Sequence, residues 1–141
     1  HLVNTAHAVG IAKPKVAIIA ATEQMLAGMP ACVEAAMLAK MVDRGQIKGC
    51  IADGPLALDV AVSKEAVEIK GLHSEVAGDA DCLLFPNIES ANVFFKAATH
   101  IGGSELAAMV MGTKVPCVLT SRGDTALTKK YSIALACLAA R

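Results

Sequence analysis

Aromatic residues are scarce in this chain, where they make up 3% of the 141 residues and include no tryptophan. Hydrophobic residues nevertheless make up 55% of the sequence, so the core must be built from Ala, Val, Leu, Ile and Met. A core of small aliphatic side chains is typical of helices layered on a sheet. The length fits one domain, or most of one domain with a piece of another.

The chain also has no excess of either charge, because 13 Lys and Arg residues balance 13 Asp and Glu residues. The missing basic surplus argues against nucleic acid as a partner. No apolar run approaches the ~20 residues of a membrane span, and no signal-peptide pattern is present. We therefore expect a cytoplasmic protein with no membrane partner.

Several site signatures are missing as well. No His, Cys and carboxylate cluster has the spacing of metal ligands, so we expect no metal. Neither a G-x-G-x-x-G nor a Walker A pattern occurs, and no histidine stands in an obvious triad relation to a serine. The cysteines form no CxxC pair, and most lie in apolar runs. We therefore predict reduced core thiols, none of them catalytic, at Cys32, Cys50, Cys82, Cys117 and Cys137.

Apolar strand-like runs alternate with helical patterns along the chain. The expected strands are 16–20, 47–52, 80–85 and 115–119, whereas 107–111 fits strand or helix. The expected helices are 2–11, 30–44, 56–62, 63–70, 89–101 and 125–140. This order predicts an α/β fold with a mainly parallel sheet and flanking helices. Because helices 30–44 and 125–140 carry few polar residues, we expect other structure to cover them. Along one side of helix 30–44, beginning just before it, lie Met29, Val33, Met37 and Met41, and we expect these side chains to pack against other structure.

Three strand-like runs are followed by polar loops, namely Asp53-Gly54-Pro55, 86–92 and 120–124. Because the carboxyl ends of parallel strands form the edge where ligands bind, we expect these loops to converge there. Taken one at a time, each loop is also explained by turn formation or helix capping. The first is a turn sequence that should end its strand, and Asp124 or Thr125 can cap the last helix.

The loop after residues 115–119 carries the most chemistry. Thr120 and Ser121 supply hydroxyls, Arg122 a guanidinium and Asp124 a carboxylate. Arg122 can hold phosphate or carboxylate through two parallel hydrogen bonds, and the start of the following helix favours an anion. These residues predict an oxyanion site without specifying a reaction.

The order of these stretches resembles the phosphate acyltransferases, the family of phosphate acetyltransferase and phosphate butyryltransferase. The resemblance spans nearly the whole chain, which resembles the C-terminal half of those enzymes. Phe85-Pro86-Asn87-Ile88-Glu89 and the run 115–122 favour the butyryl branch. The stretches that carry the resemblance are 16–20, Asp53-Gly54-Pro55-Leu56 with Asp59, 85–92 and Thr120-Ser121-Arg122.

The resemblance implies transfer of a butyryl or short branched acyl group from acyl-CoA to inorganic phosphate. Coenzyme A would be a substrate or product, and no other cofactor is implied. The implied fold is related to isocitrate and isopropylmalate dehydrogenases, with the cleft between two α/β domains. Residues 1–113 would form one domain, and 114–141 would return to a domain absent from this sequence. We also expect a homo-oligomer.

The implied catalytic residues are Ser121 and Arg122. The residues implied to contact substrates are Asp53, Gly54, Pro55, Asn87, Asn92, Thr120 and Asp124. The acetyl branch has a proposed base seven residues beyond the loop serine, where this chain has Thr128. The general base is therefore unassigned.

Two alternative interpretations stay open. The chain can be an inactive fragment or CoA-binding module, or an oxidoreductase of the related dehydrogenase fold. Because half of a two-domain cleft leaves the oxyanion facing water, we expect little activity from these 141 residues alone.

Overall fold

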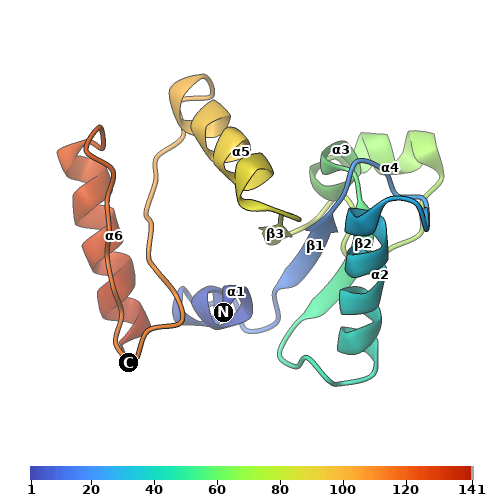
Figure 1. The fold of residues 1–141 in the computed structure, drawn as a ribbon, viewed down its shortest axis with the longest axis horizontal. Coiled ribbons are helices and arrows are strands. Elements are labelled where there is room, and N and C mark those ends of the chain that lie inside the picture. The colour runs from blue at the N-terminus through green and yellow to red at the C-terminus, as the bar shows by residue number, and fades with distance from the viewer. Residues whose placement is uncertain (141) are drawn as a thin grey trace. The chain divides into compact units, whose positions relative to one another are not determined.

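A computed structural model describes residues 1–140, which divide into two compact units. One unit comprises residues 12–91, and the other combines residues 1–11 with the residues from Asn92 onward. The elements (Figure 1) are, in chain order, α1 (Leu2–Ala8), β1 (Lys15–Ile19), α2 (Pro30–Asp43), β2 (Ile51–Leu56), α3 (Leu58–Val62), α4 (Lys64–Lys70), β3 (Cys82–Leu84), α5 (Ile88–His100) and α6 (Ala126–Ala139). None of the helices in this described part is long and apolar enough to cross a membrane.

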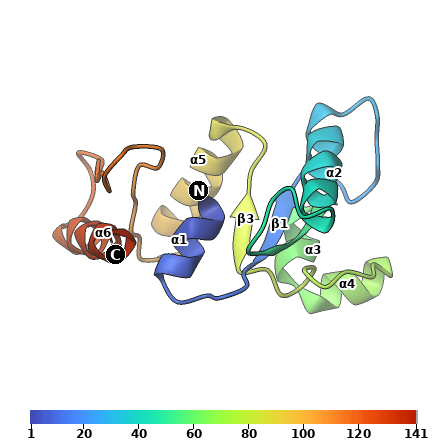
Figure 2. The same cartoon turned by 90° about the horizontal axis from the view of Figure 1, so that it is seen from below.

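Unit 12–91 is built on a parallel three-stranded sheet in the order β2-β1-β3, and Figure 2 shows β3 beside β1. Ala17 of β1 pairs with Asp53 of β2 and with Leu83 of β3. Helix α2 packs against β1 and β2, and α3 contacts β1. The predicted α/β fold with a parallel sheet is thus confirmed, and the central strand β1 is buried from Val16 to Ile19.

The predicted boundaries of helices 30–44 and 63–70 are confirmed to within one residue, whereas the helix predicted from Leu56 starts at Leu58, because Leu56 belongs to β2. Helix α2 starts at Pro30, where a missing N–H costs nothing. Helix α4 starts after Ser63, whose hydroxyl accepts a hydrogen bond from the Ala66 amide at 3.3 Å. It ends at Gly71, which has a φ of 64°, a value that glycine adopts without steric cost.

The predicted strand 47–52 with a turn at residues 53–55 is wrong. Strand β2 begins at Ile51 and continues through Asp53, Gly54 and Pro55 to Leu56. Gly54 lies so close to its neighbours that an added Cβ would be 2.8 Å from the Ile18 Cβ. Tertiary packing therefore overrides the turn preference of this sequence, because only glycine lets the strand approach β1 this closely.

The prediction that α2 is mostly covered is also wrong. Its buried side is Cys32 and Ala35, whereas Val33 and Met37 are 41% and 60% exposed. With the preceding loop, which includes Met25, these exposed residues border a groove of about 410 Å³. The row of methionines thus packs only in part, since a single sheet face covers only one side of the helix.

The other unit contains α1 and α6, which contact each other, and the residues of α5 from Asn92 onward. The predicted strand 115–119 is wrong, and 107–111, predicted as strand or helix, is neither: within residues 102–124 the backbone forms one isolated antiparallel bridge, between Val110 and Cys117. Val115 and Leu119 are 69% and 77% exposed. An apolar run becomes a strand only where neighbouring strands pair with its backbone, and here the pairing stops at one bridge.

Helix α6 is confirmed in its bounds, but the prediction that it is covered is wrong. Ser132 is its one buried residue. The thiols of Cys117 and Cys137 are exposed, so the prediction of core cysteines is wrong for these two. It is confirmed for Cys32 and Cys82, which are buried in unit 12–91, whereas Cys50 is half-buried.

Candidate active site

The loop before α6 is closed by a pair of reciprocal hydrogen bonds. The Ser121 amide donates to the Asp124 carboxylate at 2.7 Å, and the Asp124 amide donates to the Ser121 carbonyl at 3.1 Å. Thr125, rather than Asp124, caps the helix, because its hydroxyl accepts a hydrogen bond from the Thr128 amide at 3.1 Å. Asp124 therefore holds the turn and Thr125 starts the helix. Arg122 lies inside this turn, between the hydrogen-bonded residues Ser121 and Asp124.

Arg122 and Ser121 are both exposed. Within the described part of the chain, Arg122 forms no ion pair and no hydrogen bond that would occupy its guanidinium. A guanidinium without a carboxylate partner can offer its planar fork to an anion. Thr120 is half-buried at the start of the same loop. The predicted oxyanion-binding loop thus has the required groups on an exposed turn.

A hollow of about 280 Å³ lies beside this loop, within the same unit. Its walls come from α5, the segment after α5, the loop residues Gly123 to Thr125, and the first turns of α6. Its polar lining includes Asp124 and the hydrogen-bonded pair of Glu105 and Tyr131. That hydrogen bond, with the charge of Glu105, raises the pKa of the Tyr131 phenol, which therefore stays neutral.

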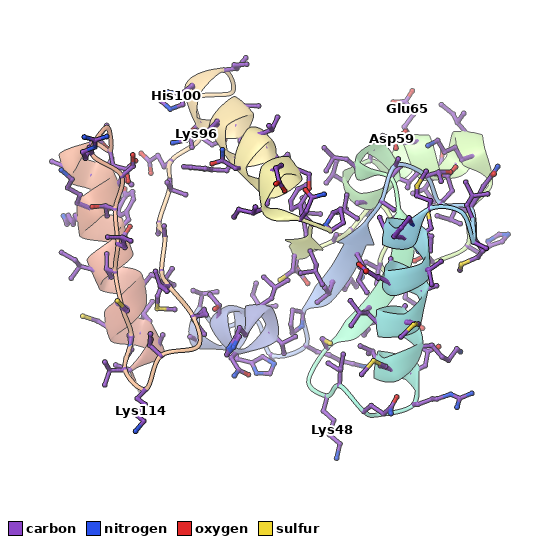
Figure 3. All side chains as sticks on the ribbon, in the orientation of Figure 1. Lys48, Asp59, Glu65, Lys96, His100 and Lys114 are labelled. Carbon is purple, nitrogen blue, oxygen red and sulfur yellow. The ribbon has the colours of Figure 1, made fainter. Side chains whose placement is uncertain are left out.

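The C-terminal end of α5 contributes to the same hollow through Phe95, Thr99 and His100. Figure 3 shows His100 and Lys96 on this part of α5. The Lys96 ammonium lies 4.4 Å from the centroid of the Phe95 ring and does not line the hollow. Asn92 is exposed one turn before Lys96.

The remaining predicted site residues belong to unit 12–91. Asn87 follows β3 and caps α5: its side-chain oxygen accepts a hydrogen bond from the Ser90 amide at 2.9 Å. Asp53 is half-buried within β2, and its carboxylate accepts a hydrogen bond from the Gly54 amide at 2.8 Å. Gly54 and Pro55 are buried. Packing and capping thus account for these four residues, and their predicted contact with substrate stays a prediction.

The two groups of predicted residues lie in different compact units. Asp53, Gly54, Pro55 and Asn87 lie in unit 12–91. Asn92, Thr120, Ser121, Arg122 and Asp124 lie in the other unit. The expectation of three polar loops at strand ends on one sheet edge is wrong, because residues 53–55 lie inside β2 and residues 120–124 follow a segment with one isolated bridge instead of a strand. The division at residue 113 stays a prediction.

Unit 12–91 also contains a charged cluster that no sequence pattern predicted. The Lys70 ammonium lies 3.3 Å from a Glu23 carboxylate oxygen and 3.0 Å from an Asp59 oxygen. Its hydrogen bond to Asp59 is the main cause that lowers the pKa of that carboxyl. The sequence offered one signal, because Glu23 lies in the polar loop that follows β1. The Glu105–Tyr131 pair was missed as well, since these residues are far apart in the sequence.

Comparisons with known proteins give the chain a family. The family model described as phosphate acetyl/butaryl transferase matches residues 2–137. Phosphate butyryltransferase from Clostridium acetobutylicum is 55% identical over 98% of this chain and 46% of its own length. Phosphate acetyltransferase from Thermotoga maritima is 52% identical over 96% of this chain and 46% of its own length.

A solved structure agrees with these matches. The branched-chain phosphotransacylase from Enterococcus faecalis V583 superposes with a TM-score of 0.88 and 34% identity, covering 99% of this chain and 50% of that one. The chain thus spans about half the length of the relatives it matches. The expected correspondence to the C-terminal half of the family is not confirmed by these matches. With the α/β fold and the matched residues 2–137 in agreement, the chain belongs to the phosphate acetyl/butyryl transferase family.

Proposed function

We propose that this chain is part of an enzyme that transfers a short acyl group from acyl-CoA to inorganic phosphate. The family match supports this proposal, as do the relatives that are named phosphate butyryltransferase and phosphate acetyltransferase. Within the molecule, the observation that carries it is the exposed Arg122 on a turn closed from both ends. Such a turn presents a permanent positive charge at a fixed place, as a phosphate subsite requires.

The chemistry needs few groups from the protein. A phosphate oxygen attacks the thioester carbonyl carbon, the carbonyl oxygen becomes an oxyanion, and the C–S bond then breaks to release the CoA thiolate. Arg122 would hold the attacking phosphate and offset its charge, and the Ser121 hydroxyl would donate a hydrogen bond to phosphate or oxyanion. Because phosphate attacks directly, Ser121 has no need to act as a nucleophile.

For the acyl group, we propose butyryl or a short branched chain. Two similar proteins support this acyl class by their names: the phosphate butyryltransferase of Clostridium acetobutylicum and the branched-chain phosphotransacylase of Enterococcus faecalis V583. The acetyltransferase of Thermotoga maritima is almost as similar in sequence, so acetyl-CoA is the necessary comparison substrate.

The test is a thiol-release assay on the protein produced from its complete reading frame, with butyryl-CoA or acetyl-CoA and phosphate. Losing charge-assisted hydrogen bonds costs about 1.5–3 kcal/mol, so Arg122→Ala should lower kcat/KM roughly 10- to 150-fold. Arg122→Lys should retain part of this activity, with a raised KM for phosphate, because lysine keeps the charge and loses the fork.

Arg44 supplies the matched control, since it is an exposed arginine at the end of α2 in unit 12–91. Arg44→Lys and Arg44→Ala should leave the kinetics unchanged. Wild-type protein that binds acyl-CoA without releasing thiol would refute the transferase proposal in favour of a CoA-binding module. Unchanged kinetics in Arg122→Ala would show that the loop has only a structural role.

A further inference from the structure

The hollow beside the Arg122 loop has an apolar part that the phosphate subsite does not use. Phe95 of α5, Leu106 of the following segment and Leu127 of α6 all line it. Asp124 connects the hollow to the loop, because it lines the hollow and its carboxylate accepts the hydrogen bond from the Ser121 amide. A group bound in the hollow therefore lies next to the turn that presents Arg122.

The charges around the hollow are unsuited to an anion. Glu105 and Asp124 both line it, and His100 is the one basic side chain among its lining residues, all of which are described. Tyr131 does not compensate, since its phenol is hydrogen-bonded to Glu105. Two carboxylates next to three apolar side chains repel phosphate and accept an uncharged group.

The size of the hollow fits a short chain. Its volume of about 280 Å³ corresponds to roughly nine water molecules at ~30 Å³ each. A butyryl group has five non-hydrogen atoms, so it fits with space for a branch or for the thioester sulfur.

We propose that this hollow receives the acyl chain of acyl-CoA and that Leu127 is a specificity-determining residue that limits its length. The proposal rests on the proposed function, and it adds the acyl class: short, uncharged chains. Leu127 belongs to the first turn of α6, whose backbone is held by the Thr125 cap, and its side chain lines the hollow. Glu105 and Asp124 exclude acyl groups that carry a carboxylate, such as succinyl.

The test changes Leu127 in both directions in the protein from its complete reading frame. Leu127→Phe fills the hollow, and Leu127→Ala enlarges it. Each methylene buried on an apolar surface is worth about a factor of four, so the two methylenes that distinguish butyryl from acetyl are worth about 15-fold. Leu127→Phe should lower the butyryl-to-acetyl ratio of kcat/KM by about that factor. Leu127→Ala should raise the hexanoyl-to-butyryl ratio several-fold, and wild type should use succinyl-CoA poorly.

Leu138 gives a matched control on the same helix. It is 38% exposed, against 41% for Leu127, and it does not line the hollow. Leu138→Phe and Leu138→Ala should leave all ratios unchanged. Ratios that stay within twofold of wild type in both Leu127 variants, with acetyl-CoA turnover intact, would overturn the acyl-pocket proposal alone. Absence of thiol release from wild type with every acyl-CoA would instead refute the proposed function. Because ratios within one variant are compared, partial misfolding lowers both rates and does not imitate the expected result.

Discussion

Replacing Gly54 with alanine should destabilise the protein through a single added methyl group. The new Cβ would lie 2.8 Å from the Ile18 Cβ, 2.9 Å from the Ile18 carbonyl oxygen and 3.2 Å from the Ala35 Cβ. The first two distances are shorter than real Cβ contacts, so β1, β2 or α2 must move. Because the φ of Gly54 is not in the left-handed region, space and not backbone conformation is the reason for glycine.

The expected magnitude follows from the cost of overpacking a close-packed core, about 1–3 kcal/mol. One of the contacted atoms is a backbone oxygen in the central strand, which cannot rotate away as a side chain can. We therefore expect the upper part of that range, about 2–3 kcal/mol, and a fall of about 1–2 M in the urea midpoint. Equilibrium urea unfolding followed by far-UV circular dichroism measures it directly.

Gly28 is the control, because a Cβ there would meet nothing within 4 Å and its φ is also outside the left-handed region. Gly28→Ala should leave stability unchanged or raise it by about 0.4–1 kcal/mol, since alanine restricts the unfolded chain. Equal midpoints for Gly54→Ala and wild type would refute the close approach of β2 to β1 and α2. So would an equal loss of stability in both variants.

Three further predictions concern charge, thiols and a buried hydroxyl. Lys70 lowers the pKa of the Asp59 carboxyl below its ordinary 3.8, so this ion pair stabilises the fold above that pH and its contribution is lost as the pH falls further. Asp59→Asn should therefore flatten the fall of the urea midpoint on the acid side, and an unchanged slope would show that the pair does not stabilise the fold. Cys117 is exposed and should react rapidly with a thiol reagent, whereas Cys82 should react only on unfolding, because burial raises the pKa of the Cys82 thiol. Cys117→Ser should keep full thiol-release activity, and a loss of that activity would show that Cys117 has a functional role. Ser132→Ala should lower the free energy of unfolding, measured in urea, by about 1–3 kcal/mol. The buried Ser132 hydroxyl accepts a hydrogen bond from the Ala108 amide at 3.0 Å and donates one to the Thr128 carbonyl at 2.7 Å. A stability equal to wild type would show that water replaces the hydroxyl.

Local signals in the sequence predicted much of the fold. Pro30 marks the start of α2, and Ser63 and Gly71 mark the two ends of α4. These predictions succeeded because capping and backbone preferences act between residues a few positions apart. The central strand was predictable for a similar reason, since a continuous apolar run such as 16–19, in which Val16, Ile18 and Ile19 are β-branched, packs well on both faces of a sheet.

Predictions that depended on distant partners failed. The turn sequence at Asp53-Gly54-Pro55 became part of a strand because β1 and α2 approach it closely. The apolar run 115–119 looked like a buried strand, yet its backbone finds one bridge, from Cys117 to Val110. Composition shows that a segment can be covered, but it does not show whether a covering element lies there.

The sequence by itself determined the alternation of helices and strands, the exposed polar turn with Ser121 and Arg122, and the family resemblance that the comparisons then showed. Only the tertiary structure decided that Gly54 is a packing contact, that Asp124 ties the turn, and that Leu127 and Glu105 line one hollow. The physical reason is that capping and strand propensity depend on covalently near neighbours. A hollow is instead made by side chains from separate elements, and folding alone brings these together.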